Sequence, residues 1–159
     1  MVWFMLPILC GLGLAFGVNA DVRTSDFADL YLGTWAGVGN LQANDDVCIA
    51  IENADVYSVL VSGSGSMNEF VLSNGSSWLN IEVFYNDDAG VNGANQLTPG
   101  VVLSGQTIPQ NKKVKPKKSA DDCKKRLNAN VSVRVSESAL AKASPGNYFG
   151  SLTLTIIPE

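Results

Sequence analysis

The stretch that decides the fold is Tyr148-Phe149-Gly150-Ser151-Leu152-Thr153-Leu154-Thr155-Ile156. Leu152, Leu154 and Ile156 fall on one face and the serine and threonines on the other, which is the period of two expected of a half-buried β-strand. The sequence ends soon afterwards, at Glu159. A long apolar strand left open at a sheet edge is a liability that proteins normally cover. We therefore expect this strand to be covered either by an earlier strand or by another chain.

Residues 1–20 are typical of a secretory signal peptide. They contain no charged side chain, and their apolar run ends in Val18-Asn19-Ala20, a small-residue cleavage pattern. The alternative is a transmembrane anchor, but the run is shorter than the roughly 20 residues that a span needs. We expect export and cleavage after Ala20, which leaves residues 21–159 as one domain.

Composition argues against several classes of function. The net charge of −4 is mild and does not favour nucleic-acid binding. The sequence has no histidine, which removes His-based catalytic triads and ordinary His-containing metal sites. We expect a protein that is not an enzyme, with no cofactor, no metal site and no small-molecule substrate. A carboxylate pair such as Glu82 and Asp87 could act on glycosides, but nothing in the sequence brings the two together.

Two cysteines, Cys48 and Cys123, remain after removal of the signal peptide. An even number of cysteines in an exported chain indicates one disulfide between them. The alternative is two free, buried thiols.

Short runs of β-branched and aromatic residues, separated by turn residues, continue through the chain. The expected strands cover residues 30–38, 47–51, 56–62, 69–73, 79–85, 101–103, 127–135 and 147–157. Residues 44–46 are expected to form a turn, Asn74-Gly75 a type I′ hairpin turn, and residues 136–143 one helical turn. This series of short strands, without a sustained helical period, predicts an all-β, immunoglobulin-like antiparallel sandwich. Residues 21–30 are expected to form an extended arm.

Three motifs in this order resemble one family. They are a cysteine strand (Val47-Cys48-Ile49), a Tyr-x-Val-x-Val strand (Tyr57 to Val61) and the closing Leu152-Thr153-Leu154-Thr155-Ile156. The order is similar to that of pilin-type subunits of chaperone–usher systems, and more narrowly to the spore coat protein U family, which includes subunits of archaic chaperone–usher pili. The resemblance covers most of residues 21–159.

The resemblance implies a sandwich that lacks its final strand. The gap would be an acceptor groove lined by Leu32, Tyr148, Leu152, Leu154 and Ile156. A periplasmic chaperone, and then a neighbouring pilin subunit, would fill the groove with a strand of its own. The implied protein is a fimbria-like fibre subunit that passes through the periplasm and an outer-membrane usher to the cell surface and supports adhesion or biofilm.

The N-terminal arm departs from the family pattern. Val22, Phe27 and Leu30 would be the donor residues if the arm donates a strand, but Asp26 and Asp29 interrupt the apolar alternation that a donor needs. Either the arm is a weak donor, or the subunit receives a strand and gives none. The expected disulfide also departs, since family disulfides often join the first two strands.

A self-contained secreted binding module is the alternative function. Residues 111–126 hold most of the basic side chains, and Lys112, Lys113, Lys115, Lys117 and Lys118 would contact a polyanion unless the loop is simply solvated. A glycan could stack on Tyr31, Trp35 and Trp78, although strand aromatics more often pack in cores. The acidic pairs at 45–46 and 87–88 offer oxygen ligands for calcium, but neither pair has a recognised calcium-loop spacing, and aspartate is the usual residue of turns.

Overall fold

The computed structural model describes residues 21–25, 27–113 and 126–159. The predicted signal peptide and most of the basic loop, including Lys115, Lys117, Lys118 and Cys123, lie outside this part of the chain. Within the described ranges, no helix has both the length and the apolar character required to cross a membrane.

The regular secondary structure of the described chain is almost entirely β-strand. The strands are β1 (Val22–Ser25), β2 (Leu41–Ile51), β3 (Val56–Gly63), β4 (Val71–Ser73), β5 (Trp78–Asn80), β6 (Glu82–Asn86), β7 (Asn95–Gln96), β8 (Val102–Thr107), β9 (Ala129–Val135) and β10 (Leu152–Pro158). The helical segments are short: η1 (Ser66–Asn68), η2 (Gln110–Lys112) and α2 (Glu137–Leu140). The predicted helical turn at 136–143 is confirmed by α2.

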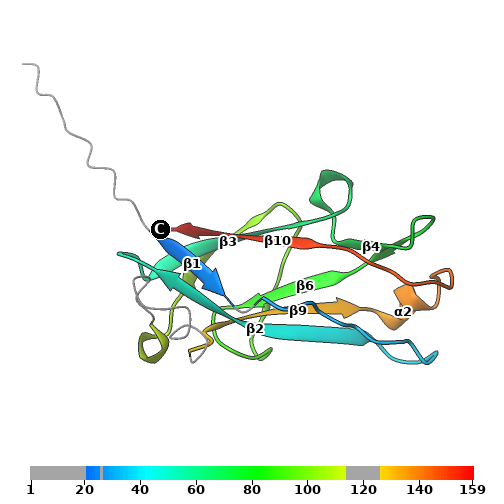
Figure 1. The fold of residues 1–159 in the computed structure, drawn as a ribbon, viewed down its shortest axis with the longest axis horizontal. Coiled ribbons are helices and arrows are strands. Elements are labelled where there is room, and N and C mark those ends of the chain that lie inside the picture. Colours follow the sequence, from blue (N-terminus) through cyan, green and yellow to red (C-terminus); the bar gives the residue numbers. More distant parts are fainter. Residues whose placement is uncertain (1–20, 26, 114–125) are drawn as a thin grey trace, which may run out of the picture.

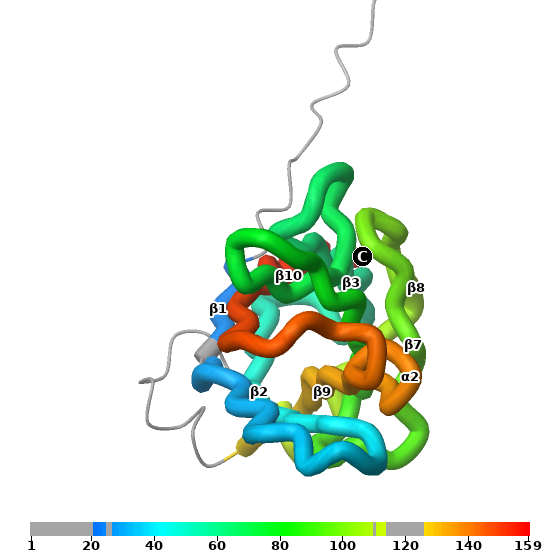
Figure 2. The backbone as a smooth tube through the Cα atoms, turned by 90° about the vertical axis from the view of Figure 1, so that its right-hand side faces the viewer, coloured from blue at the N-terminus to red at the C-terminus, as the bar shows by residue number. Residues whose placement is uncertain are grey.

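Two antiparallel sheets face each other, with a short hairpin at one end. One sheet has the order β1-β2-β9-β6-β7, the other β10-β3-β8, and the hairpin is β4-β5. Figure 1 shows β3 and β10 running above β9 and β2, and Figure 2 shows the same two layers from the side. The predicted all-β antiparallel sandwich is confirmed.

The core lies between the sheets because alternate residues of the facing strands are apolar. Val47, Ile49 and Ile51 of β2 meet Tyr57, Val59 and Val61 of β3, and all six are buried. Val131, Val133 and Val135 extend the same layer on β9. Burial of this apolar row is the main stabilising contribution to the fold.

Two local predictions are wrong. Residues 30–38 form no regular strand, because Gly33 and Gly37 adopt φ values of +83° and +93°, which lie outside the β region. Residues 44–46 form no turn but lie inside β2, paired with Ser132, Val131 and Asn130 of β9. The propensity of Asn and Asp for turns is overridden here by cross-strand pairing.

The predicted hairpin at Asn74-Gly75 is present, but its turn differs from type I′. β4 and β5 pair through Ser73 and Trp78, which leaves residues 74–77 as the loop. Gly75 has φ of +90°, whereas Asn74 is not in the positive-φ region. The Asn74 Oδ1 accepts hydrogen bonds from the N–H groups of Ser76 and Ser77 instead, at 3.0 and 2.8 Å.

Candidate strand-acceptor groove

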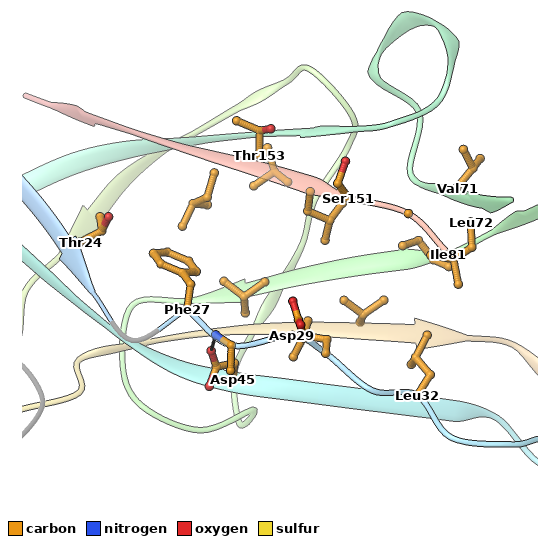
Figure 3. A pocket seen from close by; sticks show the side chains of 18 residues that line it. Thr24, Phe27, Asp29, Leu32, Asp45, Val71, Leu72, Ile81, Ser151 and Thr153 are labelled. Carbon is orange, nitrogen blue, oxygen red and sulfur yellow. Dashed lines mark hydrogen bonds between the residues drawn. The ribbon is translucent and has the colours of Figure 1, made fainter. Parts of the chain in front are cut away.

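A groove of about 580 Å³ separates β10 from the sheet that contains β2 and β9 (Figure 3). Residues 150–154 form one wall and residues 27–30, with Leu32 and Asp45, form the other. Its remaining lining is mostly apolar and comes from the strands beneath: Val61, Val71, Leu72, Ile81, Val131 and Val133, with Thr24 at one end.

The wall formed by β10 is a free sheet edge. β10 pairs with β3 on one side, and no described strand pairs with its other side. The Glu159 N–H donates to the Val56 carbonyl at 3.0 Å, and hydrogen-bonded pairs alternate along an antiparallel ladder. The backbone N–H and C=O groups of Leu152, Leu154 and Ile156 therefore point away from β3, along the open edge.

Side chains on this strand are less buried than their neighbours across the ladder. Leu152, Leu154 and Ile156 pack against the core but remain half-buried, whereas Val59 and Val61 of β3 are 0% and 2% exposed. Leu154 pairs with Val61, and Ile156 with Val59. The apolar side chains of β10 are therefore covered only on the side of β3, and a strand added at the open edge would bury more of their surface.

Gly150 lets the chain enter β10 close to the hairpin. A Cβ at this position would lie 2.5 Å from the Val71 carbonyl oxygen and 2.9 Å from Leu72 Cδ2. Just before it, Phe149 and Ser73 exchange two backbone hydrogen bonds of 2.9 and 2.7 Å. The N-terminal end of the groove wall is therefore held against β4.

The predicted groove residues are only partly brought together. Leu32, Leu152 and Leu154 line the groove. Tyr148 and Ile156 are not in its lining; both pack against the core, and the Tyr148 hydroxyl donates to the Ser144 carbonyl at 2.9 Å.

The predicted donor arm is partly taken up by the fold itself. Val22 lies in β1, which pairs antiparallel with β2 through Val22 and Ile51, and it is half-buried. Leu30 packs against the core and lines the groove. Phe27 also lines it but is 51% exposed. Donation by these residues to another chain stays a prediction.

Sequence reasoning missed the carboxylates of the groove, Asp29 and Asp45. Asp45 was assigned to a turn, although apolar residues occupy every second position on both sides of it: Leu41, Ala43, Val47 and Ile49. If one strand is assumed to run through Asp45, this alternation places its side chain on the same inner face as the apolar residues. Asp29 carried no comparable sequence pattern.

Lys112 and Lys113, at the described start of the basic loop, each have a carboxylate partner. Lys112 Nζ lies 2.5 Å from Asp88 Oδ1, and Lys113 Nζ lies 2.5 Å from Asp55 Oδ2. The hydrogen bond from Lys112 and that from the Ala89 N–H hold the pKa of the Asp88 carboxyl below its usual value. Polyanion binding by the lysines of this loop stays a prediction.

The remaining candidate sites do not assemble. Tyr31 and Trp78 are 82% and 65% exposed, Trp35 donates its indole N–H to Gly39 O at 2.9 Å, and no described ring contact joins the three. Glu82 Oε2 lies 2.5 Å from Arg134 Nε, and Asp87 Oδ2 accepts a hydrogen bond from the Thr107 N–H at 2.8 Å. The two carboxylates considered as a catalytic pair therefore each have a different partner.

Neither the acidic pairs nor Cys48 provide a metal site in the described chain. Asp46 accepts hydrogen bonds from Gly90 N–H and Asn130 Nδ2, both at 2.7 Å. No group of three or more potential ligands occurs within residues 21–25, 27–113 and 126–159. Cys48 is fully buried, and because Cys123 is outside the described residues, the Cys48–Cys123 pairing stays a prediction.

Comparison with known proteins supports the fold. No protein-family model and no curated protein matches the sequence. A similar solved structure is described as "Chaperone-tip adhesin complex is vital for synergistic activation of CFA/I fimbriae biogenesis", with a TM-score of 0.50 and 18% identity. The match covers 89% of this chain and 43% of the other, so the protein spans less than half the length of the chain it matches. The likeness is one of fold and agrees with a pilin-like β-sandwich; the narrower resemblance to the spore coat protein U family stays a prediction.

Proposed function

We propose that this protein is an exported subunit of a chaperone–usher type pilus or fimbria-like fibre, and that it accepts a β-strand from another chain in the groove beside β10. The observation that carries the proposal is the open edge of β10. Its backbone donors and acceptors point into an apolar groove, and its inward side chains are half-buried. In the proposed cycle, a periplasmic chaperone fills the groove first and a neighbouring subunit fills it in the fibre.

An added strand would gain two kinds of interaction in this groove. Its backbone would hydrogen-bond to the free groups of Leu152, Leu154 and Ile156, and its alternate side chains would enter the space above Val131 and Val133. Pro158 supplies no N–H, so the bonded stretch would end before it. The fold similarity to a chain from a fimbrial chaperone–adhesin complex is consistent with this role.

The test is binding of a synthetic strand to the purified protein. A nine-residue peptide with apolar side chains at alternate positions is added, and the melting temperature is measured. At a hundredfold excess over Kd, ligand linkage contributes about 2.7 kcal/mol. For a chain of this size we expect a rise in melting temperature of roughly 5–10 °C.

Two substitutions on β10 provide the matched comparison. Leu154→Lys places a charge in the groove and should abolish the rise, whereas Thr155→Lys points to the exposed face and should leave it intact. The proposal fails if the wild-type protein shows no response to any alternating apolar strand. It also fails if the full chain accumulates in a bacterial periplasm as a stable monomer without any chaperone.

A secreted glycan-binding module is the second candidate, and one observation favours it. Ser73 pairs with Trp78 on one side and Phe149 on the other, so the three side chains share one face of the sheet. The two rings are 65% and 73% exposed. Loss of polysaccharide binding in both Trp78→Ala and Phe149→Ala, with strand binding unchanged, would support this function.

A further inference from the structure

A carboxylate occupies the inward apolar row of β2. The other members of the row are Leu41, Ala43, Val47, Ile49 and Ile51, and Asp45 stands between Ala43 and Val47. Asp45 is the cross-strand partner of Val131, which is 8% exposed and lines the groove. Directly opposed residues of an antiparallel pair point to the same face, so the side chain of the half-buried Asp45 lies on the face that lines the groove.

The charges in the groove are not balanced by the described chain. The Asp45 Oδ2 accepts one hydrogen bond, from the Ala28 N–H at 2.8 Å, and no described cation pairs with it. Asp29 lines the same wall and has no described hydrogen bond or ion pair. Figure 3 shows both aspartates on the wall that faces Ser151 and Thr153 of β10.

We propose that the groove selects a strand of a different protein, one that alternates apolar side chains with a single lysine or arginine placed opposite Asp29 and Asp45. This inference rests on the proposed strand-acceptor function. Val71, Leu72 and Ile81 line the part of the groove next to the hairpin, and that part accepts apolar side chains. The two carboxylates accept the cation at the part nearer Phe27. A cation there forms charge-assisted hydrogen bonds in a partly desolvated site, where they are stronger than at an exposed surface.

The same charges disfavour the protein's own arm as the occupant. In an extended arm of a second copy, Val22, Thr24, Asp26, Ala28 and Leu30 share one face. That face would bring Asp26 into a groove that already holds two aspartates. The opposite face carries Arg23, Ser25, Phe27 and Asp29, so it would also bring in an aspartate and offers Phe27 as its one apolar side chain. Like charges brought together in such a site are repulsive, so the arm is a poor partner for this groove.

The experiment measures the affinity of labelled nine-residue peptides for the purified protein by fluorescence anisotropy. The reference peptide carries norleucine at every inward position. In a series of variants one norleucine is replaced by lysine at each inward position in turn, and one further peptide has the sequence of residues 22–30. Norleucine matches the lysine stem without the charge. We expect one lysine position to bind about tenfold more tightly than the all-norleucine peptide, and the others to bind more weakly.

Variants of the protein assign the gain to the two carboxylates. Asp45→Asn keeps an oxygen for the Ala28 N–H, and together with Asp29→Asn it should remove the preference for lysine while the all-norleucine peptide still binds. Glu137→Gln removes one exposed charge outside the groove and should leave the preference intact. The lysine preference should also weaken as salt is raised.

The outcomes separate the two proposals. If all norleucine and lysine peptides bind equally, or if the arm peptide binds as tightly as the best lysine peptide, this inference is overturned and strand acceptance stands. If no peptide binds, both fail. If one lysine position is preferred and the preference depends on Asp29 and Asp45, the inference is supported.

Discussion

The hydroxyl oxygens of Tyr57 and Tyr85 lie 2.7 Å apart in the core and join the two sheets of the sandwich. Tyr57 belongs to β3 and Tyr85 to β6, and both side chains are fully buried. Their rings meet edge to face, with centroids 6.5 Å apart and planes at 89°. Each hydroxyl is the other's hydrogen-bond partner, which is how two polar groups are accommodated in an apolar layer.

Removing both hydroxyls of this pair should cost less than the sum of the costs of removing each one alone. Tyr57→Phe leaves the Tyr85 hydroxyl buried without its partner, and we expect a loss of roughly 1–3 kcal/mol in unfolding free energy. The double variant Tyr57→Phe with Tyr85→Phe leaves no unpaired group and should be less destabilised than the sum of the single variants. Urea denaturation of the four proteins at pH 7 measures the coupling. Strict additivity would show that the hydrogen bond has no energetic role.

The same pair predicts a loss of stability in alkali. Burial raises the pKa of Tyr57 to about 12, and burial also raises the pKa of Tyr85. The folded state therefore holds its protons more tightly than the unfolded chain, whose tyrosines titrate near 10. This contribution is fully present below pH about 10 and is lost as the pH rises toward 12, by roughly 2–3 kcal/mol for Tyr57 alone.

Urea midpoints between pH 8 and 11.5 test this dependence. The wild-type midpoint should fall steeply above pH 10, and the double phenylalanine variant should show a flatter profile. If the urea midpoints of the two proteins fall equally with pH, the loss of stability in alkali comes from other groups, for example from deprotonation of lysines.

Asn128 should be one of the most sensitive polar positions. It is 1% exposed, its Oδ1 accepts from the Ile49 N–H and its Nδ2 donates to the Ile49 carbonyl, both at 2.8 Å. It thus acts as a strand partner for one residue of β2. Asn128→Ala leaves both backbone groups unpaired and should destabilise the fold by about 2–4 kcal/mol.

The exposed Asn80→Ala is the matched control for this substitution, and thermal unfolding of the two variants gives the comparison. A shift for Asn128→Ala no larger than that of the control would contradict the role of Asn128.

Gly63 is required because the chain packs against its Cα. A Cβ there would lie 2.0 Å from the Glu69 carbonyl oxygen, which also accepts the Gly65 N–H at 3.1 Å. Gly63→Ala should cost at least about 1–3 kcal/mol by overpacking. Ser62→Ala, at the half-exposed neighbouring position, should change stability by less than about 0.5 kcal/mol. Chemical denaturation measures both, and an unaffected Gly63→Ala would mean that the loop at 64–69 moves freely.

The ion pair between Lys112 and Asp88 should affect the pKa of the Asp88 carboxyl more than the free energy of unfolding. Lys112→Met removes the main cause of the lowered Asp88 pKa, so this pKa should rise toward its ordinary value. In the wild type, the lowered pKa of Asp88 stabilises the fold at pH values above the pKa of this carboxyl in the unfolded chain, and the stabilisation is lost as the pH falls. The variant lacks this contribution, so its stability should depend slightly less on acid pH. Exposure of the pair limits the change in unfolding free energy to less than about 1 kcal/mol. An NMR titration of the Asp88 carboxyl carbon provides the measurement, and an unchanged pKa would contradict the contact.

Prediction from sequence succeeded where the pattern is local. The alternation at Tyr57 to Val61 and at Val131 to Val135 correctly identified β3 and β9, since a period of two reflects one buried face. It failed at residues 30–38, where apolar residues suggested a strand but glycines at positive φ hold the chain in another conformation. It also failed at Asp45, because side-chain propensity was given more weight than the alternation around it.

The groove shows the same division. Alternation placed Leu152 and Leu154 on one face of β10, and the resemblance to pilin-type subunits predicted that this face lines a groove. Leu72 and Ile81 were not predicted to line it, since they reach the groove through the β4-β5 hairpin and β6, whose position depends on the whole sandwich. Val22 was expected in a free arm, but pairing with Ile51 places it in the first sheet.

Alternation between neighbouring residues is enough to assign strands and the inward faces of β3, β9 and β10, because it depends only on backbone geometry within each strand. Long-range pairing decides which strands are neighbours, and therefore that β10 has β3 on one side and an open groove on the other. Alternation alone would place Asp45 on the inner face of β2, but only long-range pairing brings it beside Val131 of β9 and into that groove.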